Sequence, residues 1–121
     1  MRLVDVYPYR YRADIYEFLI VKRSSHKIYA RQWRMIGGKI EENEPAWKAG
    51  LRELKEETQV VPELFWVIPS LNHFYNHRNN EIELIPAFAA KLNINGHIKL
   101  NEEHSEFKWI EFEDIDNYLP W

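Results

Sequence analysis

One segment, residues 46–58, constrains the fold more than any other, because it consists largely of residues that favour an α-helix. Pro45 stands directly before it, where helices tolerate and often prefer proline. Pro62 separates the segment from the next apolar stretch. The pattern therefore predicts one strong helix over Ala46–Thr58, and the rest of the fold has to be built around it.

The regions on either side of this helix have the patterns of β-strands. In Arg2–Arg10 the side chains at odd and even positions form two sets, which would face opposite sides of a strand. Ile15–Val21 is a continuous apolar run suited to a central strand. Leu64–Asn76 and Ile82–Leu92 predict a hairpin across the polar segment His77–Glu81.

The remaining segments complete a strand-rich pattern. In chain order they are a polar loop at 24–32, a lead-in at Trp33–Ile36, a turn or close backbone approach at Gly37-Gly38, a short strand at Phe107–Phe112, and a helix at Glu113–Leu119 that Pro120 cuts short. Strands around one strong helix, with a second helix at the end, predict an α/β sandwich around a mixed β-sheet. We expect a single domain over residues 1–121.

Composition narrows the classes of protein. The 121 residues include no cysteine, which excludes a disulfide framework, a thiolate metal site and a cysteine nucleophile. No apolar run approaches the ~20 residues of a membrane span, and no secretory leader pattern is present. We therefore expect a cytoplasmic protein without a membrane partner.

Charge is distributed unevenly along the chain. Residues 1–34 carry eight Lys and Arg against three acidic residues, whereas residues 101–121 carry seven acidic residues against one lysine. The formal net charge of −3 argues against a nucleic-acid polymer as partner. The uneven distribution suits a polyphosphate held with metal ions, and it equally suits the solvated faces of ordinary strands and helices.

Three carboxylates of the predicted helix share one face, because Glu56 and Glu57 follow Glu53 by three and four residues. Like charges at this spacing repel each other. The same face carries the smallest side chains of the helix, Ala46, Ala49 and Gly50. A Mg²⁺ site explains both features, since carboxylates bind the ion and small neighbours leave room for it. A solvated acidic face is the alternative.

The stretch Gly38–Val60, GKIEENEPAWKAGLRELKEETQV, resembles the signature of the Nudix hydrolase family, G-x5-E-x7-R-E-U-x-E-E-x-G-U with U aliphatic. The positions that match in register are Gly38, Glu44, Arg52, Glu53, Leu54, Glu56, Glu57 and Val60. Gln59 replaces the second glycine, and because glutamine adopts positive φ less readily, we expect the helix to end differently there. The resemblance implies hydrolysis of a pyrophosphate bond in a nucleotide, with Mg²⁺ or Mn²⁺ as cofactor.

The resemblance also implies roles for individual residues. The family's metal-binding carboxylates match Glu53, Glu56 and Glu57. Arg52 matches the arginine that orients them, Glu44 matches a structural or outer carboxylate, and Gly38 belongs to the loop whose backbone approaches the metals. Divalent ions suit this chemistry because they polarise the phosphoryl group and lower the pKa of bound water.

A second segment, LNEEHSEFKWI at Leu100–Ile110, resembles an element of Nudix enzymes that act on dATP-like, dihydroneopterin triphosphate or diadenosine polyphosphate substrates. In those enzymes the glutamate of an E-H-x4-W pattern faces the metals, and Glu103, His104 and Trp109 fit this spacing. We expect Glu103 to be an additional metal ligand or the general base, on a loop that closes with substrate bound. Glu53 is the rival base, and a plain polar loop is the alternative for the segment.

Candidate substrate contacts lie outside the signature. Lys22, Arg23 and Arg34 are candidates for phosphate contacts by their charge and their closeness to the signature in sequence. Phe74 and Tyr75 are candidates for a nucleobase pocket, because aromatic faces stack on bases. Surface solubility and core packing, respectively, would explain the same residues.

Together these observations predict a small metal-dependent pyrophosphohydrolase, a monomer or homodimer, acting on a (deoxy)nucleoside triphosphate such as dATP. Hydrolysis of a diadenosine polyphosphate is one alternative. A nucleotide-sensing module without turnover is another, although the intact set of carboxylates favours an enzyme.

Overall fold

Two antiparallel strands at the start of the chain lie at the centre of the sheet, β1 (Leu3–Arg12) and β2 (Ile15–Arg23). They are joined by Ala13 and Asp14, whose φ angles are 52° and 64°. Two successive positive φ angles give the tight hairpin turn that matches the twist of paired strands.

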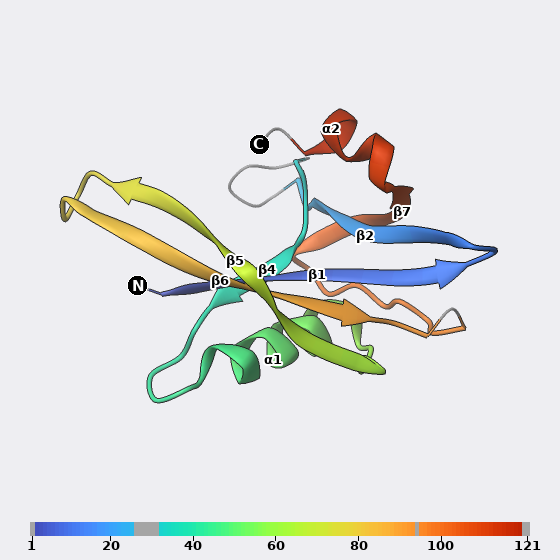
Figure 1. Cartoon of the computed structure of the whole chain (residues 1–121), viewed down its shortest axis with the longest axis horizontal. Helices are drawn as coiled ribbons and strands as arrows, with labels where there is room; N and C mark the ends of the chain where they lie inside the picture. Colours follow the sequence, from blue (N-terminus) through green and yellow to red (C-terminus); the bar gives the residue numbers. More distant parts are fainter. Residues whose placement is uncertain (1, 26–31, 94, 120–121) are drawn as a thin grey trace.

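The computed structural model describes residues 2–25, 32–93 and 95–119, and these form a seven-stranded sheet (Figure 1). The other strands are β3 (Trp33–Arg34), β4 (Ile36–Lys39), β5 (Leu64–Asn76), β6 (Glu81–Lys91) and β7 (His104–Glu111). The main strand order is β3-β2-β1-β6-β5, while β4 pairs with β1 and β7 pairs with β2. The described sheet is mixed, because β1 and β6 are parallel and the other pairs are antiparallel.

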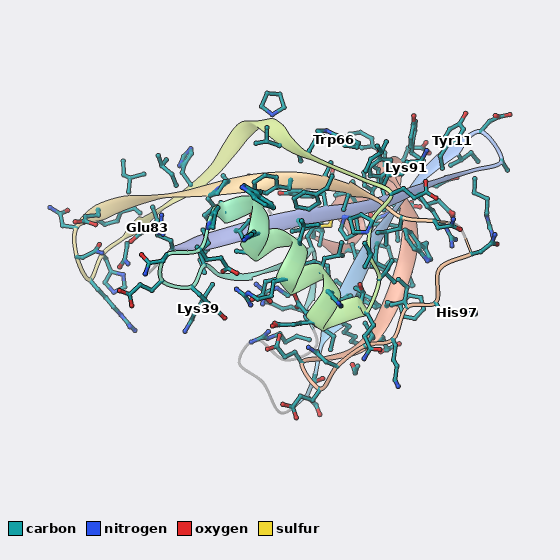
Figure 2. The ribbon with its side chains drawn as sticks, turned by 90° about the horizontal axis from the view of Figure 1, so that it is seen from below. Tyr11, Lys39, Trp66, Glu83, Lys91 and His97 are labelled. Atoms are coloured by element: carbon teal, nitrogen blue, oxygen red, sulfur yellow. The ribbon has the colours of Figure 1, made fainter. Side chains whose placement is uncertain are left out.

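The helix α1 (Ala46–Thr58) packs against one face of the sheet (Figures 1 and 2). Its residue Leu54 is fully buried in the main core cluster. Gly50 lies so close to the sheet that an added Cβ would be 3.0 Å from the Phe65 ring and 3.2 Å from Val6. The small side chains of α1 therefore permit close packing on the sheet, and do not leave room for ions as the sequence suggested.

The end of α1 differs from the sequence expectation. Gln59 adopts the left-handed conformation, with φ 60° and ψ 27°, and its N–H donates to the Lys55 carbonyl at 2.8 Å. This is the closure that glycine normally provides at a helix end. The expectation of a different helix end at Gln59 was wrong.

The opposite face of the sheet is covered by a 3₁₀ turn, η1 (Phe112–Asp114), followed by the short helix α2 (Ile115–Tyr118). A second core cluster lies there, formed by Ile20, Met35, Ile110 and Leu119. Helices on both faces of a mixed sheet confirm the expected α/β/α sandwich. Neither described helix has the length and apolar character needed to cross a membrane.

Most predicted elements lie where the sequence placed them. The helix and the strand Leu64–Asn76 have the expected bounds, and β6 is shifted by one residue. β7 begins at His104, three residues before the predicted start. The two glycines lie within β4, paired with β1, and not in a turn. The predicted loop at 24–32 lies largely outside the described residues, as does Pro120.

Candidate functional site

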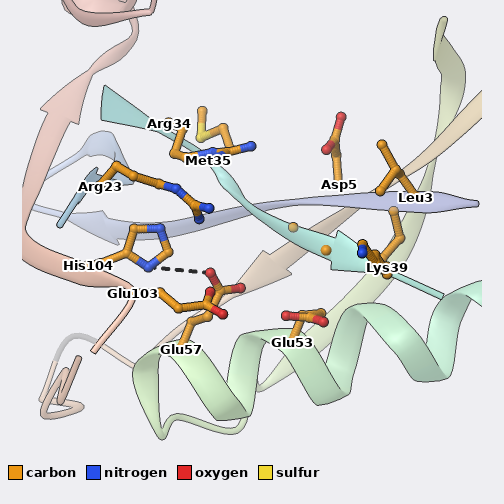
Figure 3. Close-up of a pocket in the computed structure, with 13 residues that line it drawn as sticks. Leu3, Asp5, Arg23, Arg34, Met35, Lys39, Glu53, Glu57, Glu103 and His104 are labelled. Atoms are coloured by element: carbon orange, nitrogen blue, oxygen red, sulfur yellow. Dashed lines mark ion pairs between the residues drawn. The ribbon is translucent and has the colours of Figure 1, made fainter. Parts of the chain in front are cut away.

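A cavity of about 460 Å³, the acidic cavity, lies between α1, β4 and the start of β7 (Figure 3). Its charged and polar side chains are Asp5, Arg23, Arg34, Lys39, Glu53, Glu57, Glu103 and His104. Two of the four acidic side chains, Glu53 and Glu57, come from α1, and the two arginines come from the ends of β2 and β3. Of the residues proposed from the sequence, the cavity brings together Arg23, Arg34, Gly38, Glu53, Glu57 and Glu103.

Strand β4 passes very close to α1 at Gly38. A Cβ added to Gly38 would collide with the carboxylate of Glu53, so any other residue here would displace that carboxylate. The Glu53 side chain is 13% exposed and accepts a hydrogen bond from Arg52 Nη1 at 3.0 Å. Burial raises the pKa of Glu53 against the opposing effect of Arg52, and the nearby carboxylates of Glu56 and Glu103 add to the rise.

A tight group at the end of α1 consists of Glu57, Glu103 and His104, which offer ligand atoms within 4.8 Å of one another. His104 Nδ1 lies 3.4 Å from Glu57 Oε1, and the two side chains are 1% and 3% exposed (Figure 3). Among the described residues, Glu57 Oε2 and both ring nitrogens of His104 have no hydrogen-bond partner. These orphaned atoms indicate that the group is incomplete without a ligand.

The electrostatics of this group point to a cation. Burial raises the pKa of Glu57 to about 9, and the nearby Glu53 and Glu103 add to the effect. Burial also lowers the pKa of His104 to about 4, and two nearby arginines act in the same direction. A divalent ion would stabilise the ionised form of carboxyl groups whose pKa burial has raised. Carboxylate oxygens and the nitrogens of a neutral imidazole are suitable ligand atoms for such an ion.

Arg52 is not a lining residue of the cavity, but it holds the acidic side chains of α1 in position. Its guanidinium donates to both carboxylate oxygens of Glu44, at 2.9 and 3.0 Å, and to the Lys39 carbonyl at 2.9 Å. These bonds tie α1 to the end of β4. The hydrogen bonds from Arg52 lower the pKa of Glu44 to about 2. A planar guanidinium suits this task because it donates along several directions at fixed angles.

Glu56 faces water, unlike the other two signature carboxylates of α1. Its side chain is 54% exposed and lies 3.4 Å from Arg52 Nη1, as expected for residues four apart on a helix. Glu56 is not among the residues that line the cavity. The three carboxylates that the sequence placed on one helical face therefore differ in their surroundings. Glu53 and Glu57 line the cavity, and Glu56 faces solvent.

The loop that carries Glu103 is anchored. The backbone N–H of Ser24 donates to the Glu103 carbonyl at 2.9 Å, and the Ser24 hydroxyl donates to the Glu102 carbonyl at 2.8 Å. Glu103 lies beside Glu57 in this arrangement. Closure of the loop on substrate stays a prediction.

Two of the remaining proposed contacts, Lys22 and Tyr75, lie away from the cavity. Lys22 pairs with Glu106 at 3.3 Å and is not a lining residue. Tyr75 is exposed, donates its hydroxyl to Asn80 at 2.6 Å, and lies at the outer end of the β5–β6 hairpin. Phe74 pairs with Glu83 in that hairpin, and its side chain lies outside the described part of the structure.

A second cavity of about 650 Å³, the aromatic cavity, lies on the α2 side of the sheet. Its aromatic side chains are Tyr7, Tyr9, Tyr16, Phe18, Trp66 and Phe112. Met35 lines both cavities, so the two adjoin. This cavity was not predicted from the sequence. The available signal was the alternation of Tyr7 and Tyr9 with the buried Val6 and Pro8 of β1, which places the two tyrosines on one face of the strand.

Three charged or polar residues of the acidic cavity were given no role in the site from the sequence: Asp5, Lys39 and His104. Burial raises the pKa of Asp5, while a hydrogen bond of 2.8 Å from Asn72 opposes this rise. The signal for Asp5 was a lone carboxylate in a strand of apolar and aromatic residues. The signal for His104 was its place directly after Glu103.

The chain also resembles known proteins. The family model described as NUDIX domain matches residues 2–121. The bis(5'-nucleosyl)-tetraphosphatase [asymmetrical] of Caenorhabditis elegans is 30% identical over 108 residues, covering 88% of this chain and 75% of that protein. Nucleoside triphosphatase NudI of Escherichia coli O139:H28 is 27% identical over 109 residues, covering 84% and 77%.

The fold has the same relatives. The crystal structure of a C. elegans Ap4A hydrolase binary complex has a TM-score of 0.80 at 24% identity, covering 99% of this chain and 86% of that chain. Because the family model spans nearly the whole sequence, the chain belongs to the Nudix family and is a hydrolase of phosphoric anhydrides, in a family that uses divalent metal ions.

Proposed function

We propose that the protein hydrolyses a phosphoanhydride bond of a (deoxy)nucleoside triphosphate such as dATP, with Mg²⁺ or Mn²⁺ as cofactor. The observation that carries this proposal is a single cavity shared by carboxylates and arginines. Glu53, Glu57 and Glu103 would hold cations against the charge of the phosphates. Arg23 and Arg34 would bind phosphate oxygens directly.

The metal set proposed here is Glu53, Glu56, Glu57 and Glu103 together with the backbone at Gly38. The burial and unpartnered atoms of Glu57 support its place in this set. When bound, divalent ions neutralise phosphate oxygens and lower the pKa of coordinated water. Glu53 or Glu103 would take the proton of the attacking water, and Arg52 would keep Glu53 in position through its 3.0 Å hydrogen bond.

We place the nucleobase in the aromatic cavity. Met35 lines both cavities, so a nucleotide with its phosphates beside the carboxylates can reach the aromatic side chains. Stacking on aromatic rings is worth about 1–3 kcal/mol per base and tolerates different bases. Lys22, Phe74 and Tyr75 stay predictions, and neither Lys22 nor Tyr75 lines either cavity.

Hydrolysis of a diadenosine polyphosphate is the second candidate. The name of the C. elegans relative, a bis(5'-nucleosyl)-tetraphosphatase, favours it. A sensing module that binds nucleotide without turnover is a third candidate. The buried carboxylate of Glu57, whose Oε2 has no hydrogen-bond partner among the described residues, argues against it, because nucleotide binding alone gives no reason to keep such a costly group.

The test is a hydrolysis screen of the full chain against deoxynucleotides, ribonucleotides and diadenosine tetraphosphate, with Mg²⁺ or Mn²⁺ and separation of products by anion-exchange chromatography. We expect pyrophosphate or phosphate release from a triphosphate with the highest kcat/KM. ATP plus AMP from diadenosine tetraphosphate at a higher kcat/KM would establish the second candidate. Nucleotide binding without any product would refute the enzyme.

Paired variants give this screen its control. Glu57→Gln removes one proposed ligand charge and should lower kcat by orders of magnitude. Glu63→Gln makes the same change at an exposed position outside the cavity, where Glu63 accepts a hydrogen bond from Asn93, and should leave kcat unchanged. Equal rates for both variants would remove Glu57 from the reaction.

We also infer a single domain over residues 1–121, a cytoplasmic location, a monomer or homodimer, and no nucleic-acid polymer as partner. The lack of cysteine and the net charge of −3 support the location and the choice of partner. Light scattering after size-exclusion chromatography measures the oligomeric state, and a trimer or larger assembly would contradict it.

A further inference from the structure

A histidine that the family signature does not assign lies buried within the acidic cavity. The side chain of His104 is 1% exposed, and neither of its ring nitrogens has a hydrogen-bond partner among the described residues. Oxygen Oε2 of Glu57, in the same group, is equally without a partner. Buried polar atoms are rarely left unpaired because the loss of water is not repaid. Three such atoms in one place imply an absent ligand.

The surroundings favour a cation over water as this ligand. Glu57 lies in the last turn of α1, where the helix dipole disfavours negative charge. Glu53 and Glu103 bring further negative charge to the same group. Water could satisfy the hydrogen bonds but would leave Glu57 protonated, whereas a divalent ion satisfies the donors and keeps the carboxylates ionised.

The spacing of the group fits direct coordination. Adjacent ligands of an octahedral ion at about 2.1 Å lie about 3.0 Å apart. His104 Nδ1 and Glu57 Oε1 are 3.4 Å apart, which requires only a small inward shift on binding. Ser24 fixes the backbone on the other side through its hydrogen bonds to Glu102 and Glu103. The backbone directly before His104 is therefore anchored to the end of β2.

We propose that His104 is a nitrogen ligand of the divalent cation held by Glu57 and Glu103, and that it makes this site favour Mn²⁺ over Mg²⁺. This inference rests on the proposed function and goes beyond it, because the carboxylates of the signature supply only oxygen donors. Imidazole nitrogen suits transition-metal ions, whereas Mg²⁺ binds oxygen. In the competing explanation His104 only donates a hydrogen bond to Glu57, and it then has no reason to distinguish the two ions.

The test uses Mn²⁺ alone as the probe of the full chain. Electron spin-echo envelope modulation of bound Mn²⁺ detects a directly coordinated imidazole nitrogen, and calorimetry gives the dissociation constants for Mn²⁺ and Mg²⁺. His104→Asn keeps a hydrogen-bond donor near the place of Nδ1 but removes the imidazole. His97→Asn is the matched control, because His97 is exposed and lines neither cavity.

We expect nitrogen modulation in the wild type and in His97→Asn, and its loss in His104→Asn. The Kd for Mn²⁺ should weaken at least tenfold in His104→Asn, while the Kd for Mg²⁺ changes less than threefold. Bound Mn²⁺ without nitrogen modulation in the wild type would overturn the proposal, and this measurement needs no variant to fold. Equal weakening for both ions would overturn it in favour of hydrogen bonding.

These results separate the inference from the proposed function. Nitrogen modulation in a chain that hydrolyses no nucleotide would support the ligand and refute the activity. Nucleotide hydrolysis without nitrogen modulation would do the reverse.

Discussion

Gln59 is the single departure from the signature, so a substitution at this position tests how the helix α1 ends. It adopts φ 60° and ψ 27° at the end of α1, and its side chain is exposed. The left-handed conformation costs a residue with a Cβ about 1–2 kcal/mol. Glycine avoids this cost but loses about 0.5–1 kcal/mol more backbone entropy on folding. Gln59→Gly should therefore stabilise the protein by about 0.5–1 kcal/mol.

The assay is thermal and urea unfolding, followed by circular dichroism in the presence of a chelator. For a domain of 121 residues the expected rise in Tm is about 2–4 °C. Gln59→Ala is the matched control, since it removes the same outer atoms but keeps the Cβ, and it should be no more stable than the wild type. A Gln59→Gly variant no more stable than Gln59→Ala would refute the strain at this helix end.

Three further predictions concern Arg52, Glu57 and Glu103. Arg52→Lys keeps the charge but loses the paired hydrogen bonds to Glu44, so kcat should fall about 10- to 100-fold with a smaller change in KM; steady-state kinetics that match the wild type would contradict the positioning role. The pKa of Glu57 is raised to about 9 in the folded metal-free chain, so its contribution to stability is present at low pH and is lost as pH rises through 9. Urea unfolding in chelator should thus show wild type losing stability relative to Glu57→Gln between pH 5 and 9, and parallel pH profiles would contradict this. Glu103→Gln, if Glu103 is a metal ligand, should lose activity that higher Mg²⁺ partly restores; a loss that no Mg²⁺ concentration relieves would indicate the general base instead.

Local patterns predicted the elements of the fold well. The helix has its expected bounds because Pro45 marks its start and strong helix formers fill it. The long strand at Leu64–Asn76 also has its expected bounds, because apolar and aromatic residues resume after Pro69 and Ser70, where its pairing with β6 shifts in register between Val67 and Leu71.

The candidate site was predictable only in part, because spacing along a helix does not determine burial. Glu53, Glu56 and Glu57 share a face by spacing, yet the packing of α1 on the sheet buries Glu57 and leaves Glu56 exposed. The aromatic cavity joins the hairpin of β1 and β2 to β5 and η1, which are distant from it in sequence, so no local pattern shows it. The anchoring of Glu103 by Ser24 likewise depends on a contact across 79 positions of the chain.

The central claim is that the buried carboxylates of the acidic cavity hold the catalytic cation. Anomalous diffraction from crystals of the full chain soaked in Mn²⁺ tests it most directly. We predict an anomalous peak within bonding distance of the carboxylates of Glu57 and Glu103. A peak elsewhere, or none in this cavity at a Mn²⁺ concentration that supports hydrolysis in solution, would contradict the account.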